Sequence, residues 1–138
     1  MERTLILVKP DAMGRQLGGA ILERLQKNGL KLVALKMLHM DDNLGRRHYA
    51  AHVDKPFFGD LLKFMTSAPI IAAVFEGPGA VEIARRAMGA TNPAKAEPGT
   101  IRRDFGLDIQ QNSVHGSDSP ETALSEIKLF FKGSEIFG

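Results

Sequence analysis

The sequence contains no cysteine, and its longest apolar run, Ala68–Phe75, is only 8 residues long. Without cysteine the chain cannot form a disulfide, a zinc ribbon or a thiol nucleophile. Eight apolar residues are too few to cross a bilayer, and the N-terminal run Leu5–Val8 is shorter than the core of a signal peptide. We therefore expect a cytoplasmic protein with no membrane partner.

A large excess of basic charge is also missing, because 18 lysines and arginines stand against 16 acidic residues, for a net charge of +2. Non-specific nucleic-acid binders usually carry a larger excess or gather it on one face. The basic pairs Arg46–Arg47, Arg85–Arg86 and Arg102–Arg103 are instead scattered along the chain. We expect no nucleic-acid partner, and scattered arginines also suit a small anionic ligand.

The chain does have the composition of one ordered domain, predicted over residues 1–138, with 43% hydrophobic and 25% charged residues. Hydrophobic patterning and turn residues predict strands at Thr4–Lys9, Leu30–Met40, Pro69–Glu76 and Ser113–Gly116, and helices at Leu17–Asn28, 42–52, Phe57–Met65, Ala80–Met88 and 119–131. The last helix is expected to bury Leu124, Ile127 and Phe131. Residues 89–108 show no sustained period and are interpreted as a long functional loop.

The order of the main elements predicts an α+β fold, a ferredoxin-like βαββαβ sandwich. We expect a four-stranded antiparallel sheet with its helices packed on one face. This fold supports many unrelated functions, so the function has to be argued from individual residues.

The glycine-rich nucleotide motifs are absent, since the sequence contains neither GxxxxGK[ST] nor GxGxxG. Any nucleotide site would have to use side chains. His48 and His52 have the spacing of two metal ligands on a helix, but no glutamate lies between them and no third ligand lies nearby. We interpret this pair as polar residues on a solvated helix face.

His115 lies in a polar segment between the long loop and a capped helix. A strand histidine is often only a structural hydrogen-bonding group, but Ser117, Asp118 and Glu126 could orient this one as a nucleophile for phosphoryl transfer. Lys9, Arg85 and Arg102 are either separate surface charges or a converging triphosphate site; the residues alone leave both interpretations open.

Six ordered motifs together resemble the nucleoside diphosphate kinase family. They are Lys9-Pro-Asp11, His48-Tyr49, Lys55-Pro-Phe57-Phe58, Thr91-Asn-Pro93, Pro98-Gly-Thr-Ile-Arg102 with Asp104-Phe105, and Asn112-x-x-His115-Gly-Ser117-Asp118. They have the family's order and spacing from residue 3 to about residue 131.

The resemblance implies a ping-pong phosphotransferase in which His115 takes the γ-phosphate of a nucleoside triphosphate and passes it to a nucleoside diphosphate. It implies that Glu126 and Ser117 orient the imidazole, and that Lys9 and Tyr49 lie beside the transferring phosphate. It further implies nucleotide contacts from Arg85, Thr91, Arg102 and Asn112, with Phe57, Leu61 and Ile109 forming an apolar slot for any base. From the sequence alone, the preferred interpretation of Phe57 is a core residue at the start of a helix, and the resemblance reverses that preference.

The resemblance also implies Mg²⁺ held through the substrate phosphates rather than by a protein cage, and maintenance of nucleoside triphosphate pools. ATP and other nucleoside di- and triphosphates are the expected partners, together with a homo-oligomer, a tetramer or hexamer built from dimers. The chain departs from the family pattern at Ile109, where valine is common, and at its end, which lacks the longer tail of some members.

Two other classes of function could use the same fold. An RNA-recognition domain on the same fold would need exposed aromatic residues on its first and third strands, but Leu5–Val8 has none and the third strand has only Phe75. A catalytically silent nucleotide-binding regulatory module remains the alternative, although every matched functional position is intact.

Overall fold

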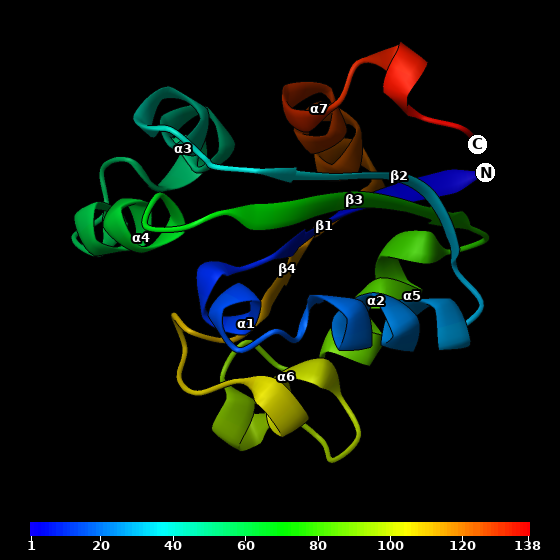
Figure 1. Cartoon of the computed structure of the whole chain (residues 1–138), viewed down its shortest axis with the longest axis horizontal. Helices are drawn as coiled ribbons and strands as arrows, with labels where there is room; N and C mark the ends of the chain where they lie inside the picture. The colour runs from blue at the N-terminus through cyan, green and yellow to red at the C-terminus, as the bar shows by residue number, and fades with distance from the viewer.

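The computed structural model describes all residues from Met1 to Gly138. Its centre is one antiparallel sheet with the strand order β2-β3-β1-β4 (Figure 1). The strands are β1 (Glu2–Val8), β2 (Lys31–Leu38), β3 (Ile70–Gly77) and β4 (Val114–Gly116). The predicted α+β, ferredoxin-like arrangement of four antiparallel strands is confirmed.

The sheet separates two hydrophobic cores, and β1 contributes to both because successive side chains of a strand point to opposite faces. Leu5 and Leu7 enter the first core, while Ile6 and Val8 enter the second. Apolar residues therefore fill the central strand continuously instead of alternating with polar ones, as expected for a strand covered on both faces.

Helices cover both faces of the sheet, so the expectation of helices on one face is wrong. The second core is closed by α2 (Gly18–Lys27) and α5 (Ala80–Met88), and the first by α7 (Pro120–Phe130) together with α4 (Phe58–Met65) (Figure 1). The aliphatic sequence of β1 already indicated that both faces are covered, because a strand with one solvated face would show polar residues at every second position.

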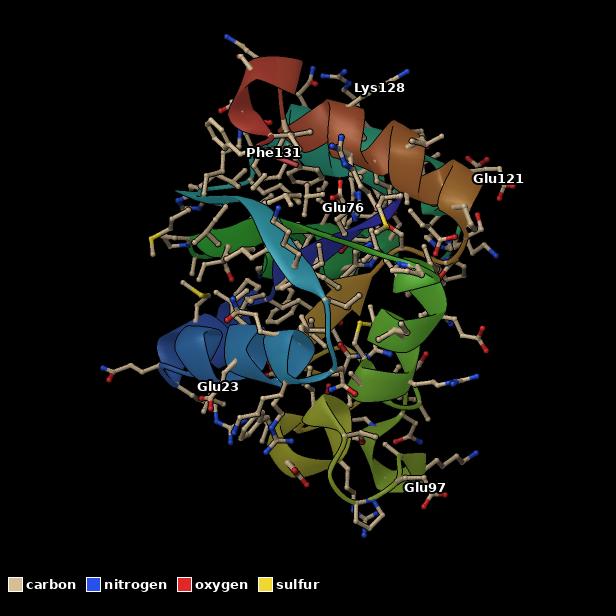
Figure 2. All side chains as sticks on the ribbon, turned by 90° about the vertical axis from the view of Figure 1, so that its right-hand side faces the viewer. Glu23, Glu76, Glu97, Glu121, Lys128 and Phe131 are labelled. Carbon is tan, nitrogen blue, oxygen red and sulfur yellow. The ribbon has the colours of Figure 1, made fainter.

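Helix α7 begins as its sequence predicts and ends near the predicted residue. Ser119 Oγ accepts a hydrogen bond from the Thr122 amide, and Pro120 occupies the first helical position. Figure 2 shows Phe131 between the end of this helix and the sheet, with Lys128 pointing outward. Leu124, which was expected to be buried, is 62% exposed because it lies on the outer face of α7.

Several short elements escaped the sequence analysis. Within residues 89–108, predicted as one loop, lie the 3-10 helix η2 (Pro93–Lys95) and α6 (Ile101–Phe105). Helix α6 is capped by Thr100, whose hydroxyl accepts from the Arg103 amide, but it is too short to show a hydrophobic period. The elements α1 (Pro10–Gly14) and η3 (Gly133–Glu135) were not predicted either. The helix predicted over 42–52 is present as two pieces, α3 (Asp42–His48) and η1 (Ala50–His52).

No helix in the structure has both the length and the apolar character needed to cross a membrane.

Candidate active site

His115 is the central residue of β4, the short strand at one edge of the sheet. It pairs with Leu7 of β1, which fixes its backbone, while its side chain is 23% exposed. Gly116 follows, and a Cβ atom at that position would lie 2.6 Å from the Met88 sulfur of α5. A larger residue beside the histidine would therefore force the buried Met88 side chain to move.

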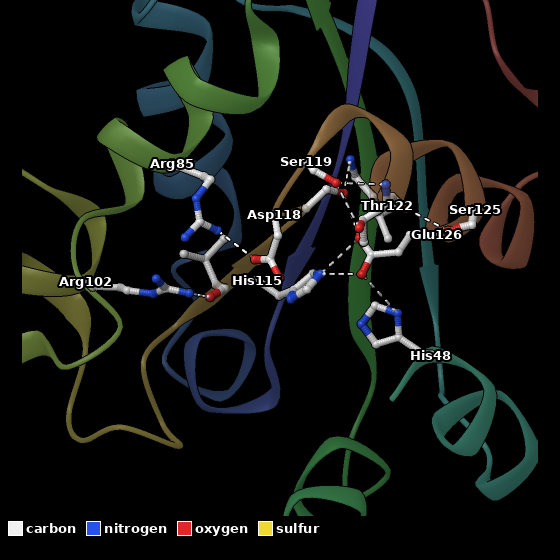
Figure 3. Close-up of polar contacts among 12 residues, drawn as sticks. His48, Arg85, Arg102, His115, Asp118, Ser119, Thr122, Ser125 and Glu126 are labelled. Atoms are coloured by element: carbon white, nitrogen blue, oxygen red, sulfur yellow. Dashed lines mark hydrogen bonds and ion pairs between the residues drawn. The ribbon is translucent and has the colours of Figure 1, made fainter. Parts of the chain in front are cut away.

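One nitrogen of the His115 ring faces a carboxylate. His115 Nε2 lies 3.3 Å from both carboxylate oxygens of Glu126, Oε1 and Oε2, and the buried Ser117 hydroxyl donates to Oε1 at 2.6 Å (Figure 3). Burial alone would raise the pKa of Glu126, but hydrogen bonds from His115 and Ser117 outweigh it and lower that pKa. An ionised carboxylate at Nε2 keeps the proton on that nitrogen, so Nδ1 carries the free lone pair.

Lys9 follows β1 and is almost fully buried, with 6% of its surface exposed. Its ammonium group donates to the Gln110 carbonyl at 2.6 Å and to Asn112 Oδ1 at 2.9 Å. Asn112 in turn donates to the Thr91 carbonyl at 3.0 Å. This hydrogen bond connects two residues that were both predicted to contact the nucleotide. Burial is the main reason that the pKa of Lys9 falls from 10.5 to about 8.

Two arginines reach the same region from different elements. Arg102 of α6 is 8% exposed and donates to the Gly89 carbonyl at 3.1 Å and to the Val114 carbonyl at 2.9 Å. Burial, followed by repulsion from Arg85, lowers the pKa of Arg102 to about 10. Arg85 of α5 forms an ion pair with Asp118 at 2.9 Å (Figure 3). Asp118, considered a partner for His115 from the sequence, therefore contacts an arginine instead.

A pocket of about 400 Å³ connects these groups. Ten of the predicted site residues line it: Lys9, Tyr49, Leu61, Arg85, Thr91, Arg102, Ile109, Asn112, His115 and Glu126. Ser117 is fully buried behind Glu126. A larger hollow of about 730 Å³ adjoins this pocket and shares Arg85 and Asp118, but no histidine lines it.

Phe57 is not among the pocket-lining residues. It precedes α4, is 49% exposed, and its ring centroid lies 5.6 Å from that of His52. The core interpretation considered for Phe57 is therefore wrong. Its proposed contact with a base stays a prediction, and its exposure leaves the ring free to make one.

His48 is the functional candidate that the sequence analysis missed. Its side chain is 1% exposed and not on a solvated helix face, because the end of α3 turns it toward α7 and β4. Its Nδ1 lies 3.8 Å from Glu126 Oε2, and its ring meets that of His115 edge-on at 4.8 Å between centroids. Burial lowers the pKa of His48 to about 3. Its neighbour Tyr49 is also buried, and burial raises the pKa of that phenol.

Comparison with known proteins agrees with this geometry. The family model described as nucleoside diphosphate kinase matches residues 2–136. A nucleoside diphosphate kinase of Dehalococcoides mccartyi is 60% identical over 136 residues, covering 99% of this chain and 96% of that protein. One from Mycolicibacterium smegmatis is 57% identical over 133 residues, covering 96% of each chain.

Solved structures with the same fold include the Aquifex aeolicus nucleoside diphosphate kinase, with a TM-score of 0.95, 43% identity and 98% of each chain covered. Another is a halophilic nucleoside diphosphate kinase from Halobacterium salinarum in complex with CDP, with a TM-score of 0.96 and 46% identity, covering 99% of this chain and 91% of that one. The family model and these relatives each extend over nearly the full length of the chain. The chain therefore belongs to the nucleoside diphosphate kinase family.

Proposed function

We propose that this protein transfers the γ-phosphate of a nucleoside triphosphate to a nucleoside diphosphate through a phosphohistidine on His115. The observation that carries the proposal is the pairing of His115 Nε2 with Glu126, which leaves Nδ1 as the nucleophilic nitrogen in a pocket lined by Lys9, Arg85 and Arg102. A neutral imidazole held in one tautomer needs no separate base, because its attacking nitrogen carries no proton.

In the first half-reaction, Nδ1 forms a bond to the γ-phosphorus as the bond from that phosphorus to the β-γ bridging oxygen breaks. The electron pair leaves with the nucleoside diphosphate, and the ring acquires positive charge that the Glu126 carboxylate balances. In the second half-reaction, a terminal phosphate oxygen of another nucleoside diphosphate attacks the same phosphorus and the N–P bond breaks. Each half-reaction leaves the proton on Nε2 in place.

Catalysis in this scheme consists mainly of positioning and charge neutralisation. We assign Lys9 and Tyr49 to the transferring phosphate, and Arg85, Thr91 and Arg102 to the other phosphates. Arg102 supports its assignment because two carbonyls hold its guanidinium and its Nε has no partner. A cation fixed before substrate arrives need not be reordered during the reaction.

The sugar and base would lie at the outer side of the pocket. Asn112 is assigned to the ribose, and Phe57, Leu61 and Ile109 to the base. Phe57 and Ile109 are 49% and 61% exposed, so their apolar side chains are free to contact a base. Such contacts involve no hydrogen bonds that would distinguish one base from another. Such contacts accept any base, and we expect broad specificity.

Mg²⁺ fits this arrangement as an ion that arrives with the nucleotide. The only carboxylates lining the pocket are Glu126 and Asp118, and these already contact His115 and Arg85. The residues therefore offer no oxygen cage, and substrate phosphates would supply most of the ligands. Bound Mg²⁺ would neutralise phosphate charge, a task it would share with Lys9, Arg85 and Arg102.

We also propose a homo-oligomer, a tetramer or hexamer built from dimers. Strand β2 lies at the edge of the sheet, where the Phe137 amide donates to its Val33 carbonyl, and further along it Leu35 and Met37 are 51% and 65% exposed. Exposed apolar side chains on an edge strand favour association with another chain. Sedimentation velocity should give an assembly larger than a monomer, and Met37→Lys should shift it toward smaller species; a monomeric wild type would refute the proposal.

The alternative, a silent nucleotide-binding regulator, has the same pocket but no transfer. Incubation with γ-labelled ATP and then GDP separates the two. We predict label on the protein that moves to GTP, and no label in His115→Ala with its fold preserved. A regulator would bind Mg-ADP without taking up label. Maintenance of triphosphate pools and a cytoplasmic location stay predictions that accompany the kinase activity.

A further inference from the structure

The His48 imidazole has no hydrogen-bond partner although it is buried. Neither Nδ1 nor Nε2 makes a hydrogen bond, and the side chain is 1% exposed. Buried polar atoms in proteins are almost always paired, so an unpaired one points to a missing ligand, ion or water. The proposed phosphotransfer assigns no role to His48, and its ring therefore needs a separate explanation.

His48 is one corner of a cluster of three ligand atoms. His48 Nδ1 lies 3.8 Å from Glu126 Oε2, and His115 Nε2 lies 3.3 Å from the same oxygen (Figure 3). The ligand atoms of the three residues all lie within 4.8 Å of one another. Zinc bonds of about 2.0–2.2 Å in a tetrahedron place two ligand atoms about 3.3 Å apart. The distance of 3.3 Å between His115 Nε2 and Glu126 Oε2 already fits this value. The other two distances between ligand atoms would have to shorten by no more than about 1.5 Å.

We propose that His48, His115 and Glu126 form an inhibitory site for a transition-metal dication of the zinc class. Two imidazoles and one carboxylate with an open fourth position is a donor set that zinc uses in proteins. The three residues also line the pocket, which supplies a route of entry and space for a fourth ligand, a water molecule. Mg²⁺ prefers oxygen ligands in an octahedron, so the ion that accompanies the nucleotide would not compete for two imidazole nitrogens.

Metal binding would inhibit because it occupies the groups that prepare His115. The ion replaces the proton on Nε2, which is released to solvent, and it uses the Glu126 oxygen that faces this nitrogen. A dication on the ring draws electron density away from Nδ1 and makes it a weaker nucleophile. It also pulls the ring toward His48, out of line with a phosphorus in the pocket. The inhibition rests on the proposed function, whereas metal binding itself does not.

The test compares His48→Asn with a matched control, His39→Asn. His39 is exposed at the end of β2, where it contacts the Thr66 carbonyl, and it is not among the pocket-lining residues. Co²⁺, a coloured substitute for Zn²⁺, is titrated into nucleotide-free protein, and Zn²⁺ binding is measured by calorimetry. A second variant, His48→Phe, keeps an aromatic ring and shows whether loss of binding follows from loss of packing. Circular dichroism checks that all variants are folded.

We expect the wild type and His39→Asn to show the visible band of tetrahedral Co²⁺. Both His48 variants should lose this band and bind Zn²⁺ about 10- to 100-fold more weakly. Loss of a residue that only hydrogen-bonds to a metal ligand already weakens binding by this factor, and His48 is proposed as a ligand itself. Equal binding by all four proteins would overturn the proposal, as would no binding by the wild type, which would mean that water alone fills the site.

The second readout is Mg²⁺-supported transfer, with each protein compared to its own rate without Zn²⁺. Zn²⁺ at concentrations that fill the site should inhibit the wild type and His39→Asn and spare His48→Asn. Metal binding that depends on His48 but leaves transfer unchanged would overturn the inhibitory role. Failure of the wild type to transfer phosphate without Zn²⁺ would refute the proposed function instead, because the Co²⁺ band does not depend on activity.

Discussion

Lys9 stabilises the proposed transition state but should destabilise the empty protein, and this conflict can be measured. Its ammonium group is buried, and the pKa of Lys9 falls from 10.5 to about 8 mainly for that reason. The difference is about 2.5 pKa units, each worth about 1.4 kcal/mol, so charging this lysine in the folded protein costs about 3 kcal/mol. Between pH 8 and 10.5 the unfolded chain binds more protons at Lys9, so the free energy of unfolding should rise with pH.

The perturbation is Lys9→Met, which keeps most of the aliphatic volume and removes the charge. At pH 7 the variant avoids the cost of about 3 kcal/mol, but it leaves the Gln110 carbonyl and Asn112 Oδ1 without their donor. Two unpaired acceptors cost about 2–4 kcal/mol together, so the two proteins should be nearly equal in stability at pH 7. At pH 10.5 Lys9 is neutral in the folded wild type, so the charging cost is gone. The variant still has the two unpaired acceptors, and the wild type should therefore be more stable by about 3 kcal/mol.

Urea unfolding of both proteins at pH 7 and 10.5 measures this difference. Arg102, whose pKa is about 10, also titrates in this range. It is present in both proteins, so most of its contribution cancels in the comparison, and the remainder is its repulsion of Lys9, which also lowers the pKa of that lysine. Activity provides the second half of the test. Loss of the ammonium should lower transfer by about 2–4 kcal/mol of transition-state stabilisation, or about 30- to 1000-fold, and Arg102→Ala should do the same.

The stability reasoning would be refuted by parallel pH profiles for wild type and Lys9→Met, because Lys9 would then carry no buried charge. A loss of less than tenfold in rate for both Lys9→Met and Arg102→Ala would refute the proposed convergence of cations on the phosphates.

Three further substitutions test separate parts of the site. Glu126→Gln should lower kcat about 100-fold with little change in KM, since the imidazole loses the carboxylate that aligns it, and unchanged kinetics would remove Glu126 from the mechanism. Gly116→Ala should destabilise the protein by about 1–3 kcal/mol in urea, because the new methyl group meets the Met88 sulfur. The same change should cost less in a Met88→Ala background, where that contact is gone, although Met88→Ala is itself destabilising because Met88 is buried in the second core. Phe57→Ala should weaken nucleotide binding by about 1–3 kcal/mol in a titration without changing the unfolding midpoint, whereas Phe137→Ala, at 78% exposure, should leave binding unchanged.

The sequence predicted the main elements because their signals are local. Ser119-Pro120 identified the start of α7, and the aliphatic run after Arg3 identified β1. The same run also indicated a strand covered on both faces, yet we predicted a sheet covered on one. The position of α7 depends on which way the chain leaves β4, and no local pattern determines that direction.

The site was predicted only as a set of residues, because its geometry depends on contacts between distant segments. Lys9 and Asn112 are 103 residues apart in sequence and form a hydrogen bond of 2.9 Å. His48 shows the opposite failure, since its helical spacing from His52 suggested a solvated face. The helix ends at His48 and η1 follows, which breaks the spacing argument and leaves His48 buried against Glu126.

The most direct test of the central claim is transfer of label through His115. Purified protein is incubated with γ-labelled ATP and no acceptor, the label is mapped, and GDP is then added. We predict label on His115 that is lost in acid, is stable in base and moves to GTP when GDP is added. Protein that is folded and binds Mg-ADP, yet takes up no label, would contradict the account and leave His115 with a structural role.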